Sequence, residues 1–142
     1  MTRYVVDASA VLHLADKGIN VSARHKLLAP TLLRSQTLSA LHEAVHVGKL
    51  PADVARERLA HIGRMPIRLL GDAVLRRRAW EIATELGWAT TYEAEYIALT
   101  QLQADAFITM DPKLGRAAKK LVEIAPIDVL RSPGGNRMTR SA

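Results

Sequence analysis

Two aspartates that follow short apolar runs are the residues of this sequence best placed to do chemistry. Asp7 follows residues 3–6, and Asp111 follows residues 106–110. Each run has the length and composition of a buried strand, and each aspartate precedes a segment that can begin a helix. The carboxyl ends of parallel strands meet at one edge of a sheet, where ligands bind in α/β folds. Two carboxylates at that edge would suit Mg²⁺ or Mn²⁺, and hence phosphodiester chemistry.

A third acidic residue is expected near the same edge. Glu93 lies in the first turn of a predicted helix that Thr90 or Thr91 caps. A carboxylate there can also simply complement the helix dipole, just as an aspartate before a helix can simply cap it, so these structural roles stand beside metal binding. Glu95 lies two residues further on and points to a different face, so we expect only one of the two glutamates to reach the site.

The composition is that of one globular domain with a basic surface. The chain has 142 residues, 49% of them hydrophobic, which is enough for a core of its own. It has no cysteine, which excludes disulfides and thiolate metal sites and fits a cytoplasmic location. We expect no signal peptide, because Asp7 interrupts the N-terminal apolar stretch and no basic leader precedes it. No apolar run is long enough for a membrane segment. The net charge of +6 favours a polyanionic partner, nucleic acid first and an acidic protein second.

Strand and helix patterns alternate along the chain. Strands are expected at residues 3–7, 27–30, 66–70, 105–110 and 122–126, and helices at 9–15, 31–47, 51–62, 72–86, 91–103 and 112–120. This alternation predicts an α/β fold with a mainly parallel central sheet and helices on both faces. The domain is expected to span residues 1–130. Residues 131–142 combine Pro, Gly and Arg and are expected to form a disordered basic tail.

Four short segments resemble a known family. They are residues 4–9 (YVVDAS), 28–33 (LAPTLL), 92–99 (YEAEYIAL) and 108–111 (ITMD). Their order and spacing resemble those of PIN domains, in particular the ribonuclease toxins of VapBC toxin–antitoxin pairs. The likeness covers about residues 3–130 and implies a PIN-like three-layer α/β fold. It also implies that the protein uses Mg²⁺ or Mn²⁺ to cut single-stranded or looped RNA and leaves a 5′-phosphate. The implied protein partners are a second copy of the chain, in a homodimer, and a cognate antitoxin.

The resemblance assigns roles to four residues. Asp7 matches the first acid of the family, Glu93 the third, which is usually Asp, and Asp111 the fourth. These three are therefore the expected metal ligands. The second acid is replaced by Gln36, which can offer a neutral carbonyl oxygen but no charge. The lost charge should weaken metal binding, so the alternative function is a PIN scaffold that binds RNA or an antitoxin but cuts poorly.

A second motif points to different chemistry. Residues 42–46 match H-E-x-x-H, in which His42 and His46 would bind zinc and Glu43 would activate water. The further glycine and third histidine of the longer zinc-peptidase motif are absent, so a zinc peptidase is kept only as a third hypothesis beside two surface histidines on a helix. Glu43 lies about 10 Å along the helix from Gln36 and is too far away to replace the missing acid.

Basic and hydroxyl residues near the acids are the expected substrate contacts. Arg34 lies near the second acidic position and Lys113 follows Asp111 by two residues, so their charges could hold phosphates. Ser9 and Thr109 are small hydroxyl residues beside the acids, with either a structural role or one in orienting the ligands. The large aromatic residues are too scattered for a base-stacking platform and are expected in the core: Trp80, Trp88, Tyr92 and Tyr96.

Overall fold

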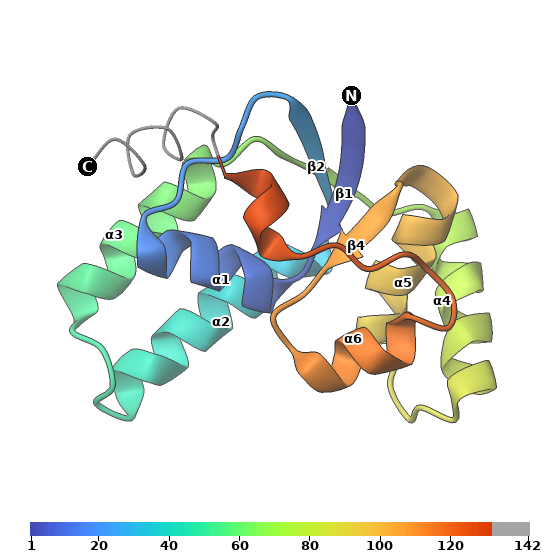
Figure 1. The fold of residues 1–142 in the computed structure, drawn as a ribbon. Helices are drawn as coiled ribbons and strands as arrows, with labels where there is room; N and C mark the ends of the chain where they lie inside the picture. The colour runs from blue at the N-terminus through green and yellow to red at the C-terminus, as the bar shows by residue number, and fades with distance from the viewer. Residues whose placement is uncertain (132–142) are drawn as a thin grey trace.

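A four-stranded parallel sheet forms the centre of the molecule. The computed structural model describes residues 1–131, and Figure 1 shows their arrangement. The strands are β1 (Thr2–Val6), β2 (His25–Pro30), β3 (Ile67–Leu70) and β4 (Ala106–Ile108). Their order in the sheet is β3-β2-β1-β4, so β1 and β2 are interior strands and β3 is an edge strand.

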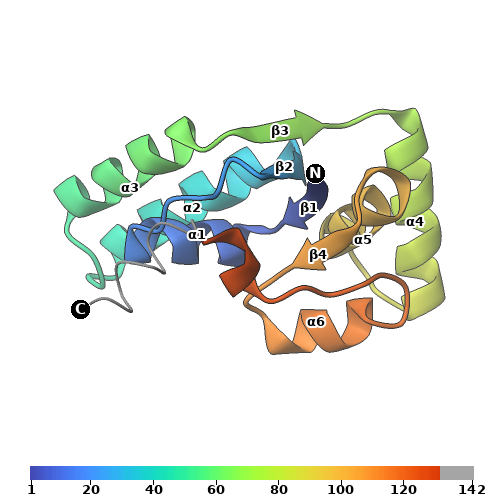
Figure 2. The same ribbon diagram turned by 45° about the horizontal axis from the view of Figure 1, so that its top comes forward.

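Helices connect the strands and cover both faces of the sheet. They are α1 (Ala8–Lys17), α2 (Leu32–His46), α3 (Ala52–Arg64), α4 (Ala73–Leu86), α5 (Tyr92–Gln103) and α6 (Pro112–Ala118). Figures 1 and 2 show α1, α2 and α3 on one side of the sheet and α4 and α5 on the other. Parallel strands require such crossover connections. The predicted α/β fold, with a parallel sheet between two helical layers, is confirmed.

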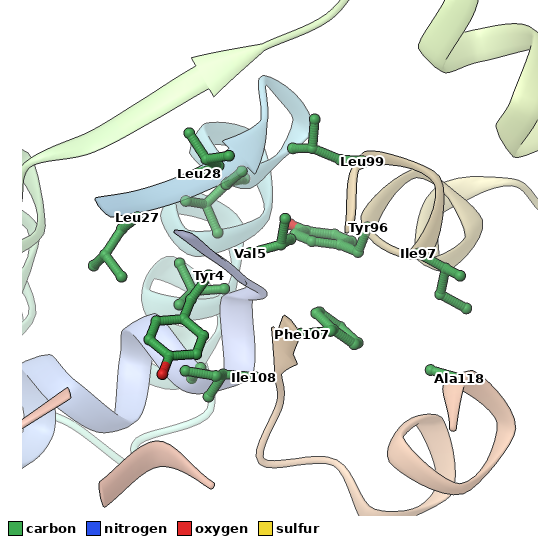
Figure 3. Close-up of a cluster of buried hydrophobic side chains, with 14 of the residues drawn as sticks. Tyr4, Val5, Leu27, Leu28, Tyr96, Ile97, Leu99, Phe107, Ile108 and Ala118 are labelled. Atoms are coloured by element: carbon green, nitrogen blue, oxygen red, sulfur yellow. The ribbon is translucent and has the colours of Figure 1, made fainter. Parts of the chain in front are cut away.

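The core between the sheet and α5 is built from alternate residues of the strands. Val5 and Leu28 face α5, where Tyr96 is almost fully buried (Figure 3). The rings of Tyr96 and Phe107 stack with their centroids 6.2 Å apart. Tyr4 points to the opposite face, as the two-residue period of a strand requires. This packing fixes α5 against β1 and β4, the two strands that lead into the candidate site.

The C-terminal part of the described chain differs from the prediction. Residues 122–126 do not form a strand but make a single parallel bridge to β4, between Ile124 and Phe107. Pro126 has no N–H to extend this pairing, and a 3₁₀ helix follows at Ile127–Leu130. Arg131 pairs with Val21 in an isolated bridge. The tail predicted for the remaining residues, 132–142, lies outside the described part of the chain.

None of the helices within residues 1–131 has the length and apolar character needed to cross a membrane.

Candidate active site

Asp7 and Asp111 lie at neighbouring points on the carboxyl edge of the sheet. The strands that precede them, β1 and β4, pair directly, with Val6 opposite Ile108. The backbone N–H of Asp7 donates to the carbonyl oxygen of Ile108 at 3.4 Å. Each aspartate is also the N-cap of the next helix, α1 or α6. The capping role and the site role are therefore combined in the same side chains.

The carboxylate of Asp7 is buried and held by three donors. Its side chain accepts hydrogen bonds from the Ser9 hydroxyl at 2.7 Å, from the backbone N–H of Ala10 at 2.9 Å and from the Thr109 hydroxyl. Only 6% of Asp7 is exposed. Because all three donors approach from fixed positions, the direction of this carboxylate is set before any ligand arrives.

The hydroxyls of Ser9 and Thr109 link the ends of the two strands. They lie 3.2 Å apart. Ser9 accepts a hydrogen bond from the backbone N–H of Met110 at 2.9 Å, and Thr109 accepts one from the backbone N–H of Asp111 at 3.1 Å. Both side chains therefore position the aspartates. The structure places them within the hydrogen-bond network of the site, although they were predicted as possible substrate contacts.

Asp111 is the less enclosed of the two aspartates. Its Oδ1 accepts hydrogen bonds from the backbone N–H groups of Lys113 at 3.0 Å and Leu114 at 3.3 Å. These bonds are the N-cap of α6. Its carboxylate lines a hollow of 360 Å³ together with Glu93, Lys113 and Trp88. Asp111 therefore faces space that a ligand can enter.

The charges of the acidic residues act on one another. Burial raises the pKa of Asp7, hydrogen bonds from Thr109 and Ser9 oppose that rise, and the charge of Asp111 adds to it. Burial also raises the pKa of Glu93, and the charges of Asp111 and Asp7 raise it further. The three acids predicted from the sequence are therefore close enough to repel one another, and bound positive charge would relieve that repulsion.

The donor set fits a hard divalent cation in its chemistry. Carboxylate oxygens are the ligands that Mg²⁺ takes from proteins, and it commonly uses only one or two of them together with waters and substrate phosphates. Within residues 1–131, no three Asp, Glu or His side chains are grouped in an arrangement that could hold a metal ion by themselves. Asp7, Glu93 and Asp111 are the residues that would hold such a cation, and waters or substrate oxygens would have to complete its coordination.

Glu95 is not coupled to the two aspartates, although its charge raises the pKa of the neighbouring Tyr96. Burial raises its pKa, and the nearby charge of Arg76 on α4 lowers it, but neither Asp7 nor Asp111 contributes. Glu93, by contrast, responds to both aspartates. Only one of the two glutamates is thus coupled to the acids of the sheet edge.

Gln36 is linked to the site by a hydrogen bond from Tyr96, a residue that was not assigned to the site from the sequence. Its side-chain Oε1 accepts a hydrogen bond of 2.5 Å from the hydroxyl of Tyr96. Burial raises the pKa of Tyr96, and the charge of Asp7 raises it further, which places this hydroxyl near Asp7. Tyr96 was expected only as a core residue. Its position three residues after Glu93, on the same face of α5, is the sequence signal that could have identified it.

The two predicted basic contacts differ in their relation to the acids. The positive charge of Lys113 lowers the pKa of Glu93, so this side chain lies beside the acidic cluster. Arg34 is exposed in the first turn of α2 and contributes to none of the shifted pKa values of the acids. Of the two, Lys113 is the better placed to hold a phosphate next to the carboxylates.

A second hollow adjoins the acidic edge on its other side. It has a volume of 420 Å³ and lies between α1 and α2, with Ser9 and Met110 at the acidic end. His13, Lys49 and Arg58 also line it. Among the described residues, Lys113 is the one basic residue that lines the first hollow, whereas in the second Arg58 is paired with Asp16 at 2.8 Å.

The residues of the H-E-x-x-H motif lie on a helix, as expected. His42, Glu43 and His46 are all exposed on α2. No third His, Asp or Glu among residues 1–131 joins them in a group that could hold a metal ion. At the sheet edge, by contrast, burial and neighbouring negative charge raise the pKa values of Asp7 and Glu93.

Comparisons with known proteins agree on the fold. No protein-family model matches the sequence, and no curated protein is a significant match. The structure is similar to that of PAE2754 from Pyrobaculum aerophilum, with 24% identity over 90% of this chain and 92% of that chain and a TM-score of 0.69. It is also similar to VapBC2 from Rickettsia felis, solved bound to a DNA fragment from their promoter, with 12% identity, 87% and 98% coverage and a TM-score of 0.60.

The likeness to these two structures extends over nearly the whole described chain. It shows that the protein has a PIN-like α/β fold, as the four segments of the sequence predicted.

Proposed function

We propose that the protein is a divalent-metal-dependent endoribonuclease, the toxin component of a type II toxin–antitoxin pair that acts in the cytoplasm. The observation that carries this proposal is the proximity of Asp7, Glu93 and Asp111 at the carboxyl edge of a PIN-like sheet, where the charge of Asp111 raises the pKa values of both Asp7 and Glu93. Such perturbed acids in an open cleft are typical of functional sites. The resemblance of the sequence to PIN-domain toxins supplies the reaction.

Each acidic residue has a defined part in this proposal. Asp7 and Glu93 would bind the cation, and Asp111 would bind it directly or through a water. Bound Mg²⁺ or Mn²⁺ would supply the positive charge that lowers the pKa of a water and makes it a nucleophile for the scissile phosphate. Ser9 and Thr109 hold the Asp7 carboxylate in place for this task. Lys113 would hold a substrate phosphate beside the acids.

The proposed partners are RNA, an antitoxin and a second copy of the chain. The net charge of +6 supports the polyanionic substrate. Leu38 on α2 is 56% exposed, which supports an apolar contact with another protein on that helix. The structural likeness to VapBC2 from Rickettsia felis supports an antitoxin as the first protein partner to test.

A second candidate function rests on Gln36. This residue brings no negative charge, and its carbonyl oxygen already accepts a hydrogen bond from Tyr96. A site with one charge fewer should bind a divalent cation more weakly. The protein would then be a PIN scaffold that binds RNA or an antitoxin and cleaves poorly.

One cleavage experiment tests the leading proposal. Purified protein is mixed with a pool of structured RNAs and Mg²⁺ or Mn²⁺, alongside the variant Asp7→Asn and a chelator control. Asparagine caps a helix as well as aspartate does, so the variant should fold; it loses the charge and one of the two oxygens that accept hydrogen bonds from Ser9, Ala10 and Thr109. Cleavage that disappears in both controls supports a metal-dependent nuclease centred on Asp7. Equal inactivity of both proteins with either metal would favour the scaffold.

A further inference from the structure

A row of basic side chains crosses the sheet away from the acidic edge. Arg3 on β1, Lys26 on β2 and Arg68 on β3 are all exposed, and together they line one hollow of 360 Å³. We call these three residues the basic strip. Arg3 precedes Asp7 by four residues on the same strand, which separates the two by about 13 Å. The basic strip is therefore separate from the site described above.

The register of the sheet brings these side chains to one face. Arg3 is the direct partner of Lys26, and Arg68 is the direct partner of Leu28. Because side chains alternate along a strand, Lys26 shares its face with Leu28, and all three basic residues emerge on the face that α5 covers. Gln103, the last residue of α5, also lines the hollow. The basic strip therefore lies where the sheet continues beyond the end of its covering helix.

The positive charges of the basic strip are not neutralised within the described chain. None of the three side chains forms an ion pair with a carboxylate of residues 1–131, although other basic residues there do. The carboxylate of Asp105 accepts a hydrogen bond of 2.8 Å from the backbone N–H of Arg3, but it forms no ion pair with the Arg3 side chain. Like charges on neighbouring strands destabilise a sheet, so this arrangement carries a cost that an anion would offset.

Protection of the sheet edge does not explain the basic strip. Charged residues on an edge strand do prevent pairing with other chains, and this accounts for Arg68 on β3. Arg3 and Lys26, however, lie on β1 and β2, which are paired on both sides. Their charges need another explanation.

We propose that the basic strip is a phosphate-binding site, and that its phosphates are those of a nucleic-acid backbone. Three adjacent strands span about 10 Å, which is wide enough to place the basic groups against more than one phosphate. Two guanidinium groups can each bind a phosphate through paired N–H donors, and the amide of Gln103 adds a neutral donor. The hollow also contains the imidazole of His25, whose ring packs edge-on against Tyr4. The three basic groups supply the charge that phosphate contacts require, and such contacts are independent of base sequence.

The test compares two variants that lose the same charge. One carries Arg3→Gln, Lys26→Gln and Arg68→Gln in the basic strip. The matched control carries Arg56→Gln, Arg77→Gln and Lys119→Gln, three exposed residues on other surfaces that also lack ion pairs within the described chain. Binding of a labelled single-stranded oligouridine is measured by fluorescence anisotropy over a range of salt concentrations. A chelator is present throughout, so the result does not depend on whether the protein cleaves RNA.

The salt dependence gives the decisive number. Three lost phosphate contacts should reduce the slope of log affinity against log salt by about 2, because each contact to a single strand contributes about 0.7. The control variant should keep the wild-type slope. An equal loss in both variants would show that only net charge matters and would overturn the proposal, as would no loss in either.

A second measurement locates the ligand and identifies its source. Amide chemical shifts of the wild-type protein are followed by NMR during titration with inorganic tripolyphosphate and, separately, with the oligouridine. Shifts at the strip residues and Gln103 with the oligouridine, at a lower phosphate concentration than with tripolyphosphate, support a nucleic-acid backbone. The reverse preference would assign the same phosphate site to a small polyphosphate. If neither ligand shifts these residues, the proposal is wrong. If the triple variant does not fold, the single variant Arg68→Gln on the edge strand replaces it in the anisotropy measurement.

Discussion

The hydroxyl of Tyr96 donates a hydrogen bond to the side-chain oxygen of Gln36, across 60 positions of the chain. The same hydroxyl lies close enough to Asp7 for the two groups to interact electrostatically. Tyr96 is held by its stacking on Phe107 in the core. The buried phenol of Tyr96 thus lies between Gln36, to which it is hydrogen-bonded, and Asp7, whose charge raises its pKa.

The variant Gln36→Glu tests what the missing charge does. Tyr96 can donate to a carboxylate as well as to an amide, so we expect the fold to be kept. The added negative charge near Asp7 should raise the affinity for Mn²⁺ about tenfold and increase RNA cleavage. The measurements are calorimetric titration with Mn²⁺ and initial cleavage rates. Gln101→Glu, on an exposed position of α5, is the control. Unchanged affinity and rate in Gln36→Glu would mean that position 36 plays no part in the site.

The variant Thr109→Val tests the hydrogen bonds that join the two aspartates. Valine keeps the shape of threonine but removes the hydroxyl that donates to Asp7 and accepts from Asp111. We expect the free energy of unfolding to fall by about 1–3 kcal/mol, because buried polar groups lose their partner. Chemical denaturation measures this change. Thr84→Val removes a hydroxyl on α4 that donates to the carbonyl of Trp80, and should cost less because that residue is exposed. Equal costs for the two variants would contradict this account of Thr109.

The pH dependence of stability should reflect the raised pKa values of Asp7 and Glu93. Their ordinary values are 3.8 and 4.5, and both are raised in the folded protein. The folded state then binds protons more tightly than the unfolded chain. Without metal, the free energy of unfolding should fall as the pH rises from about 4 through the raised pKa values, and then level off. Urea denaturation in the presence of a chelator measures the slope, which Asp7→Asn should reduce. A slope that Asp7→Asn leaves unchanged would rule out Asp7 as its source.

Divalent metal should stabilise the folded protein. A cation that binds only the folded state adds about 2.7 kcal/mol at one hundred times its dissociation constant. We expect the melting temperature of the wild type to rise with Mn²⁺ and to fall back when a chelator is added. Asp7→Asn should show a smaller rise, whereas Glu43→Gln, an exposed acid on α2, should behave as the wild type does. An equal rise in the wild type and in Asp7→Asn would show that Asp7 does not bind the cation.

The sequence predicted the fold best where an apolar, strand-like run is followed directly by a residue that can cap a helix. The apolar runs before Asp7 and Asp111 predicted two strands, and the structure pairs those strands side by side. The link between Gln36 and Tyr96 was not predictable, because it depends on how α2 and α5 pack across the molecule. The effect of Asp111 on the pKa values of Asp7 and Glu93 was not predictable either, since it depends on the separation of these residues in space.

The aromatic residues show a further limit of the sequence. Trp80 and Tyr92 were expected in the core, but they are 70% and 55% exposed, so this prediction was wrong. On α4 the core-facing positions are taken by a stripe of apolar residues that does not include Trp80: Leu75, Ala79, Ile82 and Ala83. Residue type alone predicted burial, whereas the helical period decides which side chains face the sheet.

The position of Trp88 has a practical consequence. This half-buried indole lines the same hollow as Glu93, Asp111 and Lys113, whereas the only other tryptophan, Trp80, is open to solvent. Replacing Trp80 with phenylalanine would therefore leave a single fluorophore at the mouth of the acidic site. Its emission would report occupancy of that hollow by metal or RNA in real time, without any label.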